Sequence, residues 1–392
     1  MMSSSLCHAA PVLNGQRHAL CKAHALPSPR PALSGRRVAA APSGLATAQR
    51  RGPSRYVRCR VAPIQRPSEE TVLVGDIGGT NSRLQLWSLS DSGNKEVFRK
   101  DLKNKEYSSF SEVVEAFLAL PEAQAAHPAA GCFAIAGPVD QFKQTAVMTN
   151  LGWDIAASKL EEVLGGAPCA LLNDFQAIGY GVRALDDGDI EVLHQGVLEE
   201  GQPIAVIGPG TGLGACQAFW DSGRRDYVVV PGEGSHSDFA PRTPRQMDLA
   251  RFCYDELGRS AEIEEVGCGS GLERIYRFLG GDTTSIDAAG ISKLAGEGDE
   301  LAVEALSMML EIVGQEAGHM AIRSLAFGGV YIAGGIVPKN IQIARNGRML
   351  NGFLNPTSRL SELHAKFPLY VVKNESVGLL GALHYATYLA QR

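Results

Sequence analysis

The sequence predicts an α/β protein that is built from two lobes. Apolar runs typical of β-strands alternate with helical spacing in both halves of the 392-residue chain. A glycine-rich turn between two strand patterns occurs twice, at Gly79-Thr80-Asn81 and, 131 residues later, at Gly210-Thr211-Gly212. We interpret the repeat as an ancient duplication, with chance similarity of two glycine-rich turns as the alternative. Roughly 320 residues follow position 68, which is enough for two domains that share a cleft.

The first 68 residues differ in composition from the rest of the chain. They contain eleven Lys and Arg residues and no acidic residue, and the first carboxylate is Glu69. The segment is rich in Ser, Ala and Pro but lacks the unbroken apolar stretch of a secretory signal, so residues 1–68 are expected to be a disordered organelle transit peptide. The Ser- and Ala-rich start favours a plastid, with localisation in the chloroplast stroma, over a mitochondrion. A cytoplasmic protein with a disordered basic tail is the other alternative.

The remaining body is acidic, with 26 Lys and Arg against 42 Asp and Glu residues. Such a body argues against nucleic acid as a partner, because affinity for a phosphate backbone comes from Lys and Arg. No run of 18 apolar residues is present, which excludes a membrane-spanning helix. Five scattered cysteines without a CxxC pair argue against a disulfide framework and a zinc site. This composition suits a protein that binds small molecules at a local site.

Strand and helix patterns follow one another along the body. Residues 71–77 and 82–89 are typical of a hairpin around a Gly-Gly-Thr-Asn turn, and 96–103 of a third strand. Apolar residues at helical spacing predict a helix over 110–118 that begins at a serine cap. Further strands are expected at 131–136, 170–172, 203–208, a segment ending at 219, 330–333 and 369–372, and helices at 158–164, 175–182, 299–326 and 377–390.

The first glycine-rich turn carries the residue types that nucleotide phosphates need. Asp76 lies at the end of an apolar strand, and Gly78, Gly79 and Thr80 follow it. Glycines let backbone N–H groups approach phosphate oxygens closely, and a threonine adds a hydroxyl donor. The carboxylate of Asp76 suits Mg²⁺ held through water, since this ion keeps several waters and takes few protein ligands. The sequence has no Walker-type P-loop, no protein-kinase signature and no HExxH motif.

A second reactive position is Asp174, which follows Asn173 at the junction between a predicted apolar strand and a predicted helix. A carboxylate at a helix N-terminus faces the backbone N–H dipoles, which favours its ionised form. Two interpretations fit this local pattern equally well. Asp174 is a helix N-cap in one of them and a general base for proton transfer in the other.

Seven segments of the body resemble, in the same order, the motifs of the bacterial-type glucokinases, a family within the hexokinase, actin and Hsp70-like ATPase superfamily. The resemblance covers about 71 to 388 and is carried by residues 73–83, 135–139, 148–153, 172–175, 208–214, 231–241 and 332–338. It implies a two-lobed actin-like ATPase fold, made of duplicated ribonuclease-H-like domains with a central cleft. The small lobe is expected to hold 70–184 and the C-terminal helix 376–392, and the large lobe 185–375.

The same resemblance implies an enzyme that transfers a phosphoryl group from ATP, together with Mg²⁺, to the 6-hydroxyl of glucose. Asp174 then takes the proton of that hydroxyl, which favours the general-base interpretation. The implied sugar ligands are Asn150, Asn173, Asp174, Glu233, His236 and Glu264. The implied ATP site consists of Gly75, Asp76, Ile77, Gly78, Gly79, Thr80, Gly210, Thr211, Gly212, Gly334 and Gly335. Asp76 is also the implied residue that holds Mg²⁺ through water.

Several assignments stay open. The family's Ser-Gly-Pro-Gly is Cys-Gly-Ser-Gly at 268–271, so Glu262 or Glu265 could replace Glu264 as the sugar ligand, and a solvated acidic helix edge is a further alternative. Without the resemblance, His236 would be an ordinary loop histidine. The substrate could be another hexose, such as mannose or glucosamine, and a non-catalytic sugar sensor is the other functional alternative. The sequence leaves the oligomeric state open, with a homodimer as the candidate.

Overall fold

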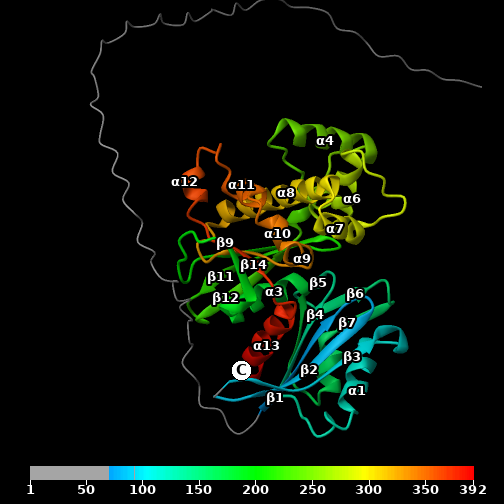
Figure 1. Cartoon of the computed structure of the whole chain (residues 1–392). Helices are drawn as coiled ribbons and strands as arrows, with labels where there is room; N and C mark the ends of the chain where they lie inside the picture. Colours follow the sequence, from blue (N-terminus) through cyan, green and yellow to red (C-terminus); the bar gives the residue numbers. More distant parts are fainter. Residues whose placement is uncertain (1–69, 92) are drawn as a thin grey trace, which may run out of the picture. The chain divides into compact units, whose positions relative to one another are not determined.

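The structure is a computed structural model that describes residues 70–91 and 93–392 (Figure 1). The predicted transit peptide at 1–68 lies outside the described residues. The first sheet has the strand order β3 (Lys95–Lys103), β2 (Asn81–Leu89), β1 (Glu70–Ile77), β4 (Ala130–Ile135) and β8 (Cys169–Asn173). The second has the order β12 (Asp226–Gly232), β11 (Leu213–Asp221), β10 (Ile204–Pro209), β13 (Val330–Ile332), β14 (Leu369–Val372) and β9 (Ile190–His194). A small third sheet contains β5 (Val139–Asp140), β6 (Thr145–Met148) and β7 (Trp153–Ala156).

The two large sheets follow one plan. In each sheet, three antiparallel strands lie side by side, and the third of them is the central strand, β1 or β10. The central strand then pairs in parallel with the next strand of the sheet. A second parallel strand follows in each sheet, β8 in the first and β14 in the second. The second sheet also has an antiparallel edge strand, β9. Each glycine turn joins the central strand to its antiparallel neighbour. The shared order and direction are those that a duplication predicts.

Helices surround these sheets. The α-helices before the second sheet are α1 (Phe110–Leu118), α2 (Ala157–Val163) and α3 (Asp174–Gly181). Those that follow are α4 (Pro244–Leu257), α5 (Glu264–Gly267), α6 (Gly269–Phe278), α7 (Ala288–Glu297), α8 (Glu300–Ser324), α9 (Ile336–Lys339), α10 (Ile341–Ala344), α11 (Arg348–Leu354), α12 (Ser361–His364) and α13 (Val377–Ala390). None of the helices in the described part is long and apolar enough to cross a bilayer.

Helices α3 and α13 lie between the two large sheets (Figure 1), and one buried cluster contains apolar side chains from both helices and both sheets. The two helices approach closely because glycines face the partner backbone. A Cβ atom on Gly381 would lie 1.7 Å from the carbonyl oxygen of Ala177, and one on Gly181 would lie 1.9 Å from that of Val377. The C-terminal helix therefore packs on α3, and it also contacts β1 and β4 of the first sheet.

The opposite face of the second sheet is covered by α8, which contacts β10. Ala205 and Ile207 of β10 are buried on the α8 side, whereas Ile204 and Val206 are buried on the side of α3 and α13. A strand that is buried on both faces has no polar positions to alternate with, which explains its continuous apolar run.

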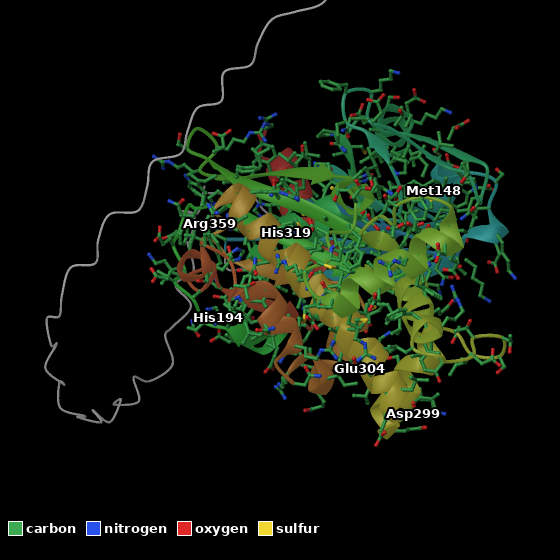
Figure 2. All side chains as sticks on the ribbon, turned by 90° about the horizontal axis from the view of Figure 1, so that it is seen from above. Met148, His194, Asp299, Glu304, His319 and Arg359 are labelled. Carbon is green, nitrogen blue, oxygen red and sulfur yellow. The ribbon has the colours of Figure 1, made fainter. Side chains whose placement is uncertain are left out.

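The long helix α8 begins after the cap residue Asp299, which accepts a hydrogen bond from the backbone N–H of Ala302 at 2.9 Å. Figure 2 shows Asp299 at the start of this helix, with Glu304 and His319 further along it. Sixteen of its residues are buried, which is why its apolar positions extend around most of its circumference.

Most of the expected elements are confirmed, and the helices at 110–118 and 377–390 agree to the residue. Ser109 caps the first of these by accepting the N–H of Glu112 at 3.2 Å. The sequence did not predict the sheet of β5, β6 and β7, the strands β9 and β12, or the helices α4–α7 and α9–α12. The strands of two to four residues and the helices of four residues are too short to show a period. Length does not explain the other omissions, because β12 has 7 residues, α4 has 14, and α6 and α7 have 10 each. The lobe boundaries at 184/185 and 375/376 stay predictions.

Candidate active site

The first glycine turn lies between β1 and β2 at Gly78-Gly79-Thr80. Asn104, which is buried, holds it: its Nδ2 donates to the carbonyl of Gly78 at 2.7 Å, and its backbone N–H donates to the carbonyl of Thr80 at 3.0 Å. Among the described atoms, nothing lies within 4 Å of a Cβ placed on Gly79. The turn is therefore fixed through its carbonyl groups while its exposed side has room for a ligand oxygen beside the backbone.

Two other residues of the predicted ATP site lie inside the strand. Ile77 is fully buried, and a Cβ on Gly75 would approach Cδ2 of Leu84 to 2.7 Å. Gly75 thus makes room for a core leucine. These two residues can offer a nucleotide only their backbone groups.

Asp76 lies between them and lines a cavity of about 330 Å³, which we call the aspartate cavity. Arg83 is its partner in the β1–β2 register and donates from Nη1 to Oδ2 of Asp76 at 3.3 Å. Burial raises the pKa of Asp76, and the positive charge of Arg83 opposes that rise. The side chain of Asp76 keeps 36 % of its surface exposed, so a hydrated ion can reach it.

The second glycine turn, Gly210-Thr211-Gly212, lies between β10 and β11. The N–H of Gly210 donates to the carbonyl of Gly212 at 2.8 Å, and the carbonyl of Gly210 accepts from the N–H of Gly269 at 2.9 Å. Since Gly269 is the first residue of α6, the N-terminus of that helix lies against the turn.

The pair Gly334-Gly335 follows β13 and lies beside this second turn. Gly334 has φ of +79°, and a Cβ on it would lie 2.6 Å from the carbonyl oxygen of Pro209, so only glycine fits. A second cavity of about 620 Å³ opens here, which we call the glycine-turn cavity. Its lining includes Gly210, Thr211, Gly269, Ser270, Glu273, Asp287, Ser292, Gly335, Lys339 and Asn340.

Asp174 is the first residue of α3, and the cap of that helix is Asn173. The Oδ1 of Asn173 accepts the N–H groups of Phe175 and Gln176 at 3.0 and 3.3 Å, and its Nδ2 donates to the carbonyl of Gly137 at 3.0 Å. The N-cap interpretation therefore belongs to Asn173. The carboxylate of Asp174 accepts the N–H of Phe175 at Oδ1, at 2.9 Å.

Burial raises the pKa of Asp174 to about 6. The hydrogen bond from the N–H of Phe175 lowers this pKa, whereas the nearby negative charge of Asp76 raises it further. The sequence-based expectation that the helix N-terminus favours the ionised form is thus outweighed by loss of water around the carboxylate. Asp174 and Asp76 line the same aspartate cavity, together with Gly334 and Gly335.

Phe175 holds the start of α3 against the second sheet. Its ring fills the space beside two glycines: a Cβ on Gly208 would lie 2.7 Å from the ring, and one on Gly214 would lie 1.9 Å from it. Cys216 of β11 donates from Sγ to the carbonyl of Phe175 at 3.1 Å. Asp174 is therefore anchored next to the two strands that carry the second glycine turn.

Glu233 and His236 lie in the loop after β12, where a short 3-10 turn spans Gly234–His236. Both side chains are exposed, with Nε2 of His236 3.9 Å from Oε2 of Glu233. The Nδ1 of His236 donates to Oε2 of Glu262 at 2.6 Å, and this hydrogen bond raises the pKa of His236. The imidazole is thereby oriented by the carboxylate behind it.

The three neighbouring glutamates have different partners. Glu262 accepts from His236, and Glu265 forms an ion pair with Arg259 at 2.8 Å. Glu264 accepts the N–H of Leu213 at Oε2, at 2.7 Å, directly after the second glycine turn. Of the three, Glu264 is thus the one in contact with that turn.

Asn150 lies in the exposed turn between β6 and β7. The aspartate cavity is lined by Asp174 but by none of the other predicted sugar ligands, as far as the described residues go. The structure therefore brings Asp76 and Asp174 together in one cavity and places Glu264 against the second glycine turn, whereas the roles of all the predicted site residues stay predictions.

Sequence reasoning missed four charged residues of this site. Lys339, Lys373 and Glu375 line the aspartate cavity, and Arg83 pairs with Asp76. A signal existed for each of them. Arg83 ends one recognised motif and Lys339 directly follows another, whereas Lys373 and Glu375 lie one and three residues after the predicted strand 369–372. Ligands of α/β folds bind at the carboxyl ends of such strands.

Comparison with known proteins identifies the family of this chain. The glucokinase family model matches residues 73–389. The glucokinase of Nostoc punctiforme is 36 % identical over 338 residues, which cover 79 % of this chain and 97 % of that protein. The glucokinase of a Synechocystis species is 36 % identical over 345 residues, which cover 79 % of this chain and 96 % of that protein.

Solved structures show the same fold. A glucokinase from an Antarctic psychrotroph superposes with a TM-score of 0.74 at 27 % identity, covering 81 % of this chain and 99 % of that one. The glucokinase of Balamuthia mandrillaris, solved in complex with glucose, has a TM-score of 0.68 at 21 % identity. The match covers 83 % of this chain and 94 % of that one. The expected two-lobed, actin-like α/β fold is thereby confirmed. Because the match covers nearly the whole described body, this chain belongs to the glucokinase family.

Proposed function

We propose that this enzyme phosphorylates glucose at its 6-hydroxyl with ATP, and that Asp174 is the general base. Membership of the glucokinase family supports the reaction. The observation that carries the role of the base is the position of Asp174, a carboxylate of raised pKa that shares one cavity with Asp76 and starts a helix anchored on β10 and β11.

In the reaction, the 6-oxygen of glucose attacks the terminal phosphorus of ATP. The new oxygen–phosphorus bond forms as the bond between that phosphorus and the bridging oxygen of ADP breaks. The proton of the hydroxyl passes to the carboxylate of Asp174. With a pKa of about 6, roughly nine-tenths of Asp174 is ionised at pH 7 and able to accept it.

The chain's own groups suit a nucleotide with Mg²⁺. The N–H groups of Gly78 and Gly210 donate within their own turns, so the phosphate oxygens would be bound by other backbone N–H groups of the turns. Asp76 offers a partly exposed carboxylate. Within the described residues, no three His, Cys, Asp or Glu side chains form a cluster that could hold a metal. Mg²⁺ would therefore be held by Asp76 through water, and it neutralises phosphate charge when bound.

For the sugar, we assign Asn173 to positioning Asp174, since its amide is engaged in the helix cap. Glu233 and His236 accept and donate hydrogen bonds to sugar hydroxyls from their exposed loop. Glu264 is favoured over Glu262 and Glu265 because the latter two are paired with basic side chains.

The test is an assay of ADP release by the purified full chain against glucose, mannose and glucosamine. We expect glucose to be the best substrate and Asp174→Ala to lower turnover by about 10²–10⁴ with the fold retained. Normal turnover by a folded Asp174→Ala protein would refute the base. If mannose or glucosamine were preferred, the substrate assignment would be wrong. A sugar-dependent thermal shift without any ADP release would instead identify a sensor.

The acid-free composition of residues 1–68 supports a plastid transit peptide, and we assign the enzyme to the chloroplast stroma. Fusion of residues 1–68 to a fluorescent reporter tests this, and a mitochondrial or cytoplasmic signal would overturn it. A homodimer stays the candidate oligomeric state. Sedimentation of the purified protein at a monomer mass would reject it.

A further inference from the structure

We propose that Lys339 is the cation that binds the terminal phosphates of ATP in this enzyme. The inference rests on the proposed function and adds a residue to it. It is carried by the position of Lys339 at the junction of two cavities, by the rigid support of the segment that bears it, and by the balance of charge around the reacting phosphate.

Lys339 lines both the aspartate cavity and the glycine-turn cavity. Gly335 is the other residue that lines both, and a Cβ on Gly335 would lie 3.7 Å from Nζ of Lys339. One of these cavities contains Asp174 and Asp76, and the other contains Gly210 and Thr211 of the second turn. A phosphate chain that runs from the second turn to the base must therefore pass beside Lys339.

The segment that carries Lys339 is held firmly on both sides. At its start, Gly334 lies against the carbonyl of Pro209, next to the second turn. At its end, the buried Asn340 donates from Nδ2 to the carbonyl of Ile336 at 2.8 Å, and its Oδ1 accepts from the hydroxyl of Ser292 on α7 at 2.9 Å. The lysine side chain is exposed on this fixed support, so its ammonium can turn toward a ligand without a shift of the backbone.

The charges of the two cavities require a cation at this place. Their acidic lining residues are Asp76, Asp174, Glu273, Asp287 and Glu375, and their basic lining residues are Lys339 and Lys373. A triphosphate that enters so acidic a cleft needs positive charge beside its terminal oxygens, where negative charge concentrates during transfer. Lys373 lines the aspartate cavity alone, which leaves Lys339 as the lysine that reaches both.

The competing interpretation is that Lys339 is a solvated surface lysine. Across the described residues, no carboxylate forms an ion pair with its ammonium, in contrast to Arg83, which is held by Asp76. A surface lysine without a role would leave nucleotide affinity unchanged when it is replaced. The two interpretations therefore differ in a measurable way.

The experiment compares Lys339→Met, Lys339→Arg and Lys373→Met in the full-length protein, with Lys159→Met as the control, because Lys159 is an exposed lysine of α2 that lines neither cavity. Titration calorimetry measures the affinities for ATP, ADP and AMP, and the affinity for glucose is measured in parallel. We expect Lys339→Met to weaken ATP and ADP binding by roughly ten- to a hundredfold, as for loss of a hydrogen bond to a charged group. AMP and glucose affinities should change less than about threefold, since neither ligand carries the terminal phosphates.

Lys339→Arg is expected to retain most of the ATP affinity, because it keeps the charge, and the control Lys159→Met should stay close to the unsubstituted protein. An equal loss for AMP and ATP would mean that Lys339 only supports the fold, and no loss for ATP would make it a surface lysine. A stronger effect of Lys373→Met than of Lys339→Met would move the role to Lys373. If the unsubstituted protein phosphorylates no hexose but Lys339→Met still weakens ATP binding, the proposed function fails while the phosphate contact stands.

Discussion

Replacing Asp174 by asparagine measures how much the burial of an ionised carboxylate lowers the free energy of unfolding. Asparagine has nearly the same shape, and its Oδ1 can still accept the N–H of Phe175, which lies 2.9 Å from Oδ1 of Asp174. The substitution therefore removes the charge and leaves the start of α3 intact. We expect the variant to lose activity and to gain stability.

The magnitude follows from the pKa of Asp174, which burial raises from an ordinary 3.8 to about 6. Because the folded state binds the proton more tightly than the unfolded state, the free energy of unfolding falls as the pH rises from about 4 through about 6. Below this range the carboxyl is neutral in both states and costs nothing. Above this range, the buried ionised group lowers the free energy of unfolding by about 3 kcal/mol, and Asp174→Asn should recover this amount.

The assay is urea denaturation of the ligand-free protein and the variant at pH 5 and pH 8. The stability gained by Asp174→Asn should be about 3 kcal/mol at pH 8 and roughly half of that at pH 5. Asp248→Asn is the control, because that side chain is 65 % exposed and its removal should give no such pH dependence. A gain that is equal at the two pH values would refute the burial argument. The same pKa predicts that kcat/KM of the unsubstituted enzyme falls about tenfold per pH unit below pH 6.

Two further substitutions test contacts away from the base. Gly381→Ala should lower the free energy of unfolding by about 3 kcal/mol, since its Cβ would lie 1.7 Å from the carbonyl of Ala177. Gly296→Ala in α7, where nothing described lies within 4 Å, should cost nothing, and equal stability of both variants would contradict the close helix crossing. Glu262→Gln should lower the pKa of His236 toward 6.5, because it removes the carboxylate that holds Nδ1. An NMR titration that finds the pKa unchanged would exclude that pair.

The local sequence pattern was sufficient to predict the elements that carry the glycine turns. The hairpin of β1 and β2, the strand β10 and the helix α13 were predictable, because apolar period and glycine-rich turns depend on neighbours in the sequence. The sheet of β5, β6 and β7 was not, since its strands have two to four residues and partly exposed positions. Its strands are defined by their pairing with one another.

The candidate site shows the same division. The sequence by itself singled out Asp76, Asp174 and the two glycine turns as candidates, because phosphate binding and proton transfer need those residue types at strand ends. For Asp174, the local pattern fitted a helix cap equally well, and only the family resemblance favoured a base. Only the tertiary structure decided that Asn173 rather than Asp174 caps α3 and that Asp174 has a raised pKa. It also decided that Lys339 lies between the two cavities. The physical reason is that burial, charge coupling and cavity walls are sums over groups far apart in the chain, which no local pattern contains.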